Sequence, residues 1–260
     1  CGIRSVAIGL ESVGPKHGIT PYRVLQAAGI SVNVDMPTVK TQLEHADMGW
    51  AYSDQRHFCP ALHALLPLRE TIIKRPLITT LESLTRPYTA SGKTHLMTGY
   101  VHKAYPPVYT SLARAAAYDS ALVLRGVEGG ITPSLLQAAK CYSYHDDGED
   151  QLHTADPHAL SLQSDKRCPP LPDDAPTVLN IQGEARVDAT AAAMLAAEAG
   201  LAALNGKSGH AYDSLVYASA LALWHVGKAS TYSRAGELAR HALDSGAALG
   251  HFKALQNHHS

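Results

Sequence analysis

The stretch from residue 69 to residue 134 constrains the fold of this 260-residue chain more than any other. Its apolar pattern changes from short β-branched runs to a helical spacing and back, which we interpret as strand or turn, strand, helix, strand and glycine loop. That order is a βαβ crossover, in which the loops after two parallel strands lie at one edge of a sheet. Open α/β folds bind ligands at this edge, so the loop 126–130 is the first candidate site.

Composition supports a large α/β core. An apolar content of 45% over 260 residues is enough to bury one. We expect one domain over residues 1–260, with a central sheet flanked by helices. The cysteines lie too far apart for a zinc site, so we expect reduced thiols. No charged and apolar leader opens the chain and no apolar run reaches the roughly 20 residues of a membrane helix. We therefore expect a cytoplasmic protein without a membrane partner.

Strands and helices are predicted from periodicity and capping residues. We predict strands near Val6, Trp50, Leu77, Leu96 and Val123 that form one sheet. N-cap, proline and glycine signals predict helices over residues 21–30, 37–46, 60–69, 111–119, 190–204, 212–225 and 231–243, and a last helix that ends near residue 255.

The segment 145–176 differs from the rest in composition. It is rich in Asp and Gly and contains five prolines. Such residues favour turns and cannot continue a central strand. We therefore predict an irregular acidic excursion outside the sheet.

Charge divides the chain into two halves. Residues 1–140 carry a net charge of +5 and residues 141–260 a net charge of −6. A basic half can attract phosphate groups, whereas the alternative interpretation is ordinary solvated surface.

Four segments carry a resemblance to a known family. The opening C-G-I-R-S-V resembles an H-G-N-R-S-V strand, and V-L-Q-A-A-G-I at 24–30 is similar to a V-L-E-A-L-G helix end. The run 67–87 aligns without gaps on P-V-R-K-x-L-G-x-R-T-x-F-N-x-L-G-P-L-x-N-P. Residues 204–223 and 237–249 resemble L-x-G, D-x-x-x-x-N-A-A and A-x-x-x-x-x-S-G-x-A segments. The chain thereby resembles the anthranilate phosphoribosyltransferase family of glycosyltransferases (family 3).

The resemblance is closest to an anthranilate-phosphoribosyltransferase-like branch for which nucleic-acid binding is described. The family as a whole implies a transferase that uses phosphoribosyl diphosphate and magnesium. Its G-T-G-G-D diphosphate loop and first helices, through which it dimerises, are expected upstream of Cys1. We therefore expect a fragment without that loop and without most of the N-terminal helical domain, and a homodimer is left open.

The glycine loop departs from the family pattern G-x-x-G-L-D-E, whose acids hold magnesium. Those two positions fall on Ile131 and Thr132, which are not carboxylates. Magnesium prefers anionic oxygen ligands, so we expect no metal cofactor. Glu128 is either a remaining metal ligand or a solvated loop residue.

The acceptor site departs as well. The family's His and Asn in H-G-N-R become Cys1 and Ile3, and the Asn of F-N-x-L-G-P becomes Thr79. Arg69 falls where the family pairs with the anthranilate carboxylate. An arginine fork suits carboxylate and phosphate equally, and a helix C-terminus also favours arginine, so both interpretations remain open.

These observations give a set of candidate residues. The candidate phosphate ligands are Arg4, Lys16, Arg69, Lys74, Arg75, Lys93, Lys103 and Arg125, and the candidate loop comprises Gly126, Glu128, Gly129 and Gly130. Lys16 lies in Lys-His-Gly, a second match to the family's Lys-Ser-Gly phosphate turn. Tyr100, Tyr105 and Tyr109 lie among these cations and either stack on bases or pack at a sheet edge.

Two functions follow, together with a weaker interpretation as a degenerate structural subunit. The first is a protein without catalysis that holds single-stranded nucleic acid, including DNA, with little sequence preference. The alternative is an active phosphoribosyltransferase with magnesium, phosphoribosyl diphosphate and an aromatic acceptor. Fold alone does not choose between them.

Overall fold

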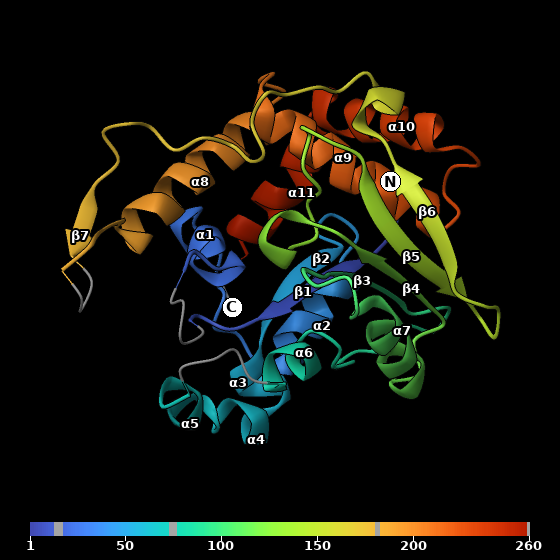
Figure 1. The fold of residues 1–260 in the computed structure, drawn as a ribbon, viewed down its shortest axis with the longest axis horizontal. Helices are drawn as coiled ribbons and strands as arrows, with labels where there is room; N and C mark the ends of the chain where they lie inside the picture. The colour runs from blue at the N-terminus through green and yellow to red at the C-terminus, as the bar shows by residue number, and fades with distance from the viewer. Residues whose placement is uncertain (13–17, 73–76, 180–182, 259–260) are drawn as a thin grey trace. The chain divides into compact units, whose positions relative to one another are not determined.

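The computed structural model describes residues 1–12, 18–72, 77–179 and 183–258 (Figure 1). The chain divides into two compact units. The first unit contains Cys1, Ser83–Pro169 and Gly206–Ser245. The second contains Gly2–Glu82, Pro170–Asn205 and Gly246–Ser260. Each unit combines β-strands with covering helices, as the predicted α/β class requires.

The first unit is built on a four-stranded sheet in the order β3-β4-β5-β6. β3 (His95–Gly99) and β4 (Ser120–Leu124) are parallel and are connected by α7 (Pro106–Ala115), so the predicted βαβ crossover is confirmed. β5 (Ala139–His145) and β6 (Gln151–Ala155) extend the sheet as an antiparallel hairpin.

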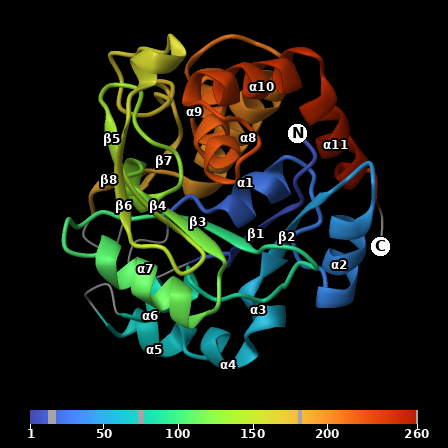
Figure 2. The same cartoon turned by 90° about the vertical axis from the view of Figure 1, so that its right-hand side faces the viewer.

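Helices cover both faces of this sheet (Figure 2). Leu96, Ala121 and Tyr144 are buried together with Ala113 of α7 on one face. Successive residues of a strand point to opposite faces of the sheet. The strand neighbours of Leu96, Ala121 and Tyr144 therefore face α9 (His210–His225). β4, inside the sheet, is therefore buried on both sides.

The other elements of this unit are short helices and α10. They are η1 (Val127–Gly129), η2 (Pro157–Leu160) and α10 (Tyr232–Asp244). The Thr231 side chain accepts a hydrogen bond from the amide of Arg234 and begins α10, as its sequence predicts.

The second unit contains a parallel pair of strands, β1 (Ser5–Gly9) and β2 (Trp50–Asp54). A separate hairpin joins β7 (Thr177–Leu179) to β8 (Ala185–Val187). The helices of this unit are α1 (Pro21–Ala27), α2 (Met36–Glu44), α3 (Gln55–Phe58), α4 (Pro60–His63), α5 (Leu66–Glu70), α6 (Ile78–Glu82), α8 (Ala189–Leu204) and α11 (Ala247–Gln256).

Aromatic and aliphatic side chains from distant segments form the core of the second unit. Tyr22 meets Tyr52 edge-on at 5.9 Å between ring centroids, and Trp50 stacks on Phe252 at 5.5 Å. The side chains of Thr20 and Asp35 cap α1 and α2. None of the helices in the described ranges is both long and apolar enough to cross a membrane.

Two predictions about strands are wrong. Leu77 is not in a strand: its carbonyl accepts the amides of Thr80 and Leu81, and the β-branched residues after it form α6. Helical bonding within the segment therefore overrides a weak β preference. The predicted single sheet is also wrong, because β1 and β2 pair with each other and β3 begins a different sheet.

The predicted excursion 145–176 is partly wrong. Its first residue ends β5, and β6 lies within it as an edge strand of the sheet. The acidic residues between them form a turn closed by Gly148, whose amide donates to the carbonyl of His145. This turn chemistry is typical of a hairpin.

Arg69 is completely buried in the second unit. Its guanidinium donates to the Glu82 carboxylate and, at 3.0 Å, to the Thr79 hydroxyl. The same Glu82 oxygen accepts from the Gln55 side-chain amide at 3.1 Å. Arg69 therefore belongs to an internal ion pair, and its guanidinium is shielded from solvent.

We predict that Arg69→Ala lowers the free energy of unfolding by about 3–5 kcal/mol, because it leaves the Glu82 carboxylate buried without its cation. Urea denaturation followed by circular dichroism measures the loss. Arg4→Ala, at an exposed arginine of the same unit, is the control and should change the free energy by about 0.5 kcal/mol or less. Equal losses in the two variants would contradict the assignment.

Candidate anion-binding pocket

The glycine loop lies directly after β4, where the sequence predicts a site. The Val127 amide donates to the Thr132 carbonyl at 2.8 Å, and the Gly130 amide donates to the Val127 carbonyl at 2.9 Å. The loop is therefore closed by its own backbone and does not depend on side chains for its shape.

Two glycines permit a very close approach of the backbone. A Cβ atom on Gly99, at the end of β3, would collide with the carbonyls of Gly129 and Gly130, and one on Gly126 would collide with Gly130. The loop thus folds back against the end of the neighbouring parallel strand. Glu128 has a positive φ of 52° inside this turn, so its backbone is in the left-handed region.

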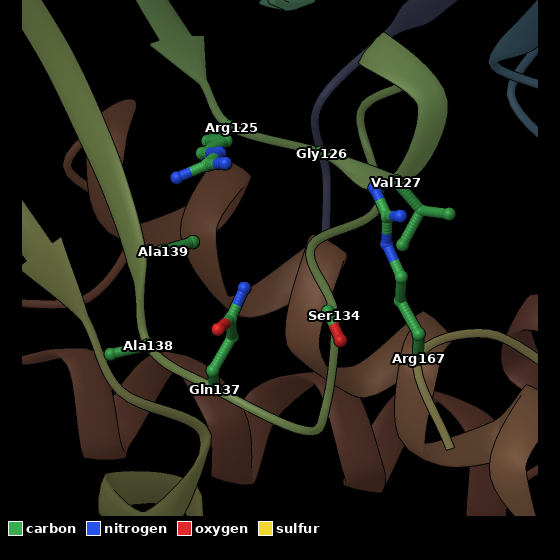
Figure 3. A pocket seen from close by; sticks show the side chains of 8 residues that line it. All are labelled: Arg125, Gly126, Val127, Ser134, Gln137, Ala138, Ala139 and Arg167. Atoms are coloured by element: carbon green, nitrogen blue, oxygen red, sulfur yellow. The ribbon is translucent and has the colours of Figure 1, made fainter. Parts of the chain in front are cut away.

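A cavity of about 210 Å³ opens beside the loop (Figure 3). Its lining residues are Arg125, Gly126, Val127, Ser134, Gln137, Ala138, Ala139 and Arg167. Arginine, serine and glutamine side chains present hydrogen-bond donors, and Figure 3 shows two arginines that reach the cavity from separate segments. The pocket is suited to an anionic group.

The two arginines differ in their partners. Within the described residues, Arg125 has no carboxylate oxygen within 4.0 Å, whereas a guanidinium nitrogen of Arg167 lies 3.8 Å from the Glu128 carboxylate. Both members of the latter pair are largely exposed, so the pair is weak. The Arg125 amide donates to the Lys140 carbonyl at 3.0 Å, which places an exposed lysine on the adjacent strand.

The loop, residues 126–132, carries one carboxylate. Its carboxylate, Glu128, lies beside Arg167, and the Thr132 carbonyl already accepts the Val127 amide. Ile131 is 49% exposed and offers no oxygen in its side chain. In the described ranges, no three His, Cys, Asp or Glu side chains are arranged to hold a metal ion.

The other predicted phosphate ligands belong to several segments of the chain. Lys103 is exposed in the segment after β3, and Arg4 is exposed just before β1 in the second unit. Lys93 pairs with Asp146 at 2.6 Å near the opposite end of β3. Lys16, Lys74 and Arg75 lie outside the described residues. Of the predicted set, Arg125 and the glycine loop meet at the pocket.

The three tyrosines have different environments. Tyr100 is 3% exposed and meets Tyr142 edge-on at 6.0 Å. Burial raises the pKa of its hydroxyl, and the nearby Arg125 opposes that rise. Tyr105 is 40% exposed and contacts Tyr109 at 6.2 Å, so this ring retains a free surface.

Sequence reasoning missed Arg167, Ser134 and Gln137. Arg167 lies in the segment predicted as an excursion, and the dipeptide Lys166-Arg167 was the available signal. The other two follow the glycine loop and have no motif of their own. Ser134 and Gln137 line the pocket because the chain between the glycine loop and β5 passes beside it.

Comparison with known proteins supports the fold. An anthranilate phosphoribosyltransferase from Thermomicrobium roseum is 27% identical over 90% of this chain and 61% of its own length. One from Azospirillum brasilense is 28% identical over 99% of this chain and 65% of its own length. The chain thus spans less than two thirds of these relatives.

A solved structure has the same fold. The crystal structure of anthranilate phosphoribosyltransferase from Thermus thermophilus matches with a TM-score of 0.72 and 18% identity, over 98% of this chain and 68% of that one. The sequence pattern described as "Glycosyl transferase family, a/b domain" matches residues 1–249. The chain therefore belongs to this glycosyl transferase family.

Proposed function

We propose that this protein binds nucleic acid through its phosphate groups, and that the pocket between Arg125 and Arg167 is the principal contact. The observation that carries the proposal is that these two arginines, from separate segments, line one cavity beside a loop with Ile131 and Thr132 at the positions of the family's magnesium acids. Guanidinium groups bind phosphate oxygens with paired hydrogen bonds.

Neighbouring residues extend this surface beyond a single phosphate. Lys140 lies on the strand next to Arg125. The segment after β3 lies against the glycine loop, because a Cβ on Gly129 would come within 2.8 Å of the Val101 side chain. That segment leads to Lys103 and the exposed ring of Tyr105. Cations beside a free aromatic face favour a single strand, whose bases stack without sequence preference.

Catalysis is the second candidate, and the relatives favour it. Those from Thermomicrobium roseum and Azospirillum brasilense carry the name anthranilate phosphoribosyltransferase, and a solved yeast anthranilate phosphoribosyltransferase contains phosphoribosyl diphosphate and magnesium. That yeast structure matches this chain with a TM-score of 0.63 and 15% identity. Ile131 and Thr132, at the positions of the family's metal acids, argue against transfer of that chemistry to this chain.

We predict that the full chain binds a fluorescent oligothymidylate and an unrelated oligonucleotide similarly, as measured by fluorescence anisotropy. Because bound cations release counterions, log affinity should fall with log salt at a slope of roughly −0.7 per phosphate contact. Arg125→Ala and Arg167→Ala should each weaken binding to both oligonucleotides and flatten the slope by about one contact.

Arg234→Ala is the matched control for these variants. Arg234 is an exposed arginine of the same unit that pairs with Glu237 on α10 and is not among the residues that line the pocket. Its loss should leave affinity and salt slope unchanged. Absence of binding at low salt, or an equal effect of all three substitutions, would show that the pocket is not the nucleic-acid contact.

We further predict no formation of phosphoribosyl anthranilate above background from anthranilate, phosphoribosyl diphosphate and magnesium. The reason is the replacement of both metal acids by Ile131 and Thr132. Steady-state fluorescence of anthranilate measures the reaction, with the Azospirillum brasilense relative as the positive control. Clear magnesium-dependent turnover would favour the second candidate.

A further inference from the structure

A row of polar side chains crosses the four-stranded sheet at the amino ends of β3 and β4. His95 is paired in register with Ser120, and Ser120 with His145, so the three residues lie side by side on adjacent strands. They occupy the face toward α9, whose last residue is His225. This row is separate from the anion pocket, which follows the carboxyl ends of the same two parallel strands.

Hydrogen bonds connect the row to the end of α9. The Ser120 hydroxyl oxygen lies 2.7 Å from His95 Nδ1 and 2.8 Å from His225 Nε2. His145 Nε2 donates to the His225 carbonyl at 2.8 Å. This carbonyl lies in the last turn of α9, where carbonyl groups have no hydrogen-bond partner within the helix. Ser120 is 1% exposed and His225 is 5% exposed, so water competes little for these contacts.

The surroundings of the His225 ring favour its neutral form. Its Nδ1 is buried and has no partner among the described residues. A proton on Nε2 can be donated to the Ser120 oxygen, and the serine proton can then be donated to His95 Nδ1. A second proton on His225 would occupy Nδ1 and would face no acceptor, which is costly in a buried site.

Burial and the surrounding imidazoles also favour the neutral form of His225. Burial and the neighbouring His145, His95 and His153 lower the pKa of His225 to about 3. Burial also lowers the pKa of His153, from β6, which bonds Ser143 at 2.9 Å.

The environment of His95 is mixed. Burial lowers its pKa, and Asp119 opposes this effect more than any other group. His145 and Lys93 add to the lowering, whereas Asp146 weakly opposes it. Desolvation outweighs the two carboxylates, so the closed arrangement holds fewer protons than free imidazoles do.

We propose that His95, Ser120, His145 and His225 form an acid-sensitive latch that holds the C-terminal turn of α9 on the sheet and opens as the pH falls. Above the ordinary pKa of histidine, about 6.5, the imidazoles of His95 and His225 are neutral whether the latch is open or closed. Below it, the open state takes up protons that the closed state excludes. Opening therefore becomes more favourable by up to about tenfold per pH unit for each such imidazole.

Amide hydrogen exchange on the full chain tests the latch. After correction for intrinsic exchange rates, opening of the amides of Val226, Gly227 and Lys228 should increase at least about tenfold between about pH 7.5 and about pH 5.5, while those of α10 change less. His225→Leu should abolish this pH dependence. His210→Leu, at the first residue of the same helix, is the matched control and should retain it.

Imidazole NMR of the unaltered protein provides a second readout that does not depend on folding of the variant. An apparent His225 midpoint well below about 6.5, with the helix end opening as it titrates, supports the latch. Titration of His225 near its ordinary value while the helix end stays closed overturns it. Equal loss of the pH response in His225→Leu and His210→Leu also overturns it.

Discussion

Parallel pairing of β3 with β4 is the constraint on which the first unit depends. A parallel pair requires a crossover, and α7 supplies it while burying Ala113 completely on one face of the sheet. The pairing aligns both ends of the strands. The glycine loop and Arg125 follow one end, and the row of His95 and Ser120 begins at the other. Two chemically different surfaces thus share one backbone support.

Local signals in the sequence predicted much of the fold. Thr20 and Asp35 are side chains whose oxygens accept amide hydrogens of the next turn, and such capping acts within a few residues. The βαβ crossover was equally predictable from the sequence, because its strands are buried and its helix is amphipathic. The strand β6 was not, because its residues are mostly exposed and its place in the sheet depends on pairing with β5.

The candidate site was only partly predictable for a similar reason. Arg125 and the glycine loop lie at a strand end that the order of elements predicts. Arg167 reaches the same pocket from beyond the β5–β6 hairpin, and such a contact has no signature in local sequence. The burial of Arg69 was not predictable either. The sequence does not distinguish an arginine that is buried beside Glu82 from one that is exposed. Only the packing around the guanidinium distinguishes them.

The glycine loop is closed by backbone hydrogen bonds, so its conformation does not depend on which side chains stand at positions 131 and 132. Thr132 holds the turn through its carbonyl, and the side chain of Ile131 is half exposed, so neither side chain is needed to form the loop. Acidic residues could therefore stand at these two positions without refolding the strand ends. The same freedom makes the loop a scaffold on which a protein engineer can vary metal affinity while the anion pocket beside it keeps its form.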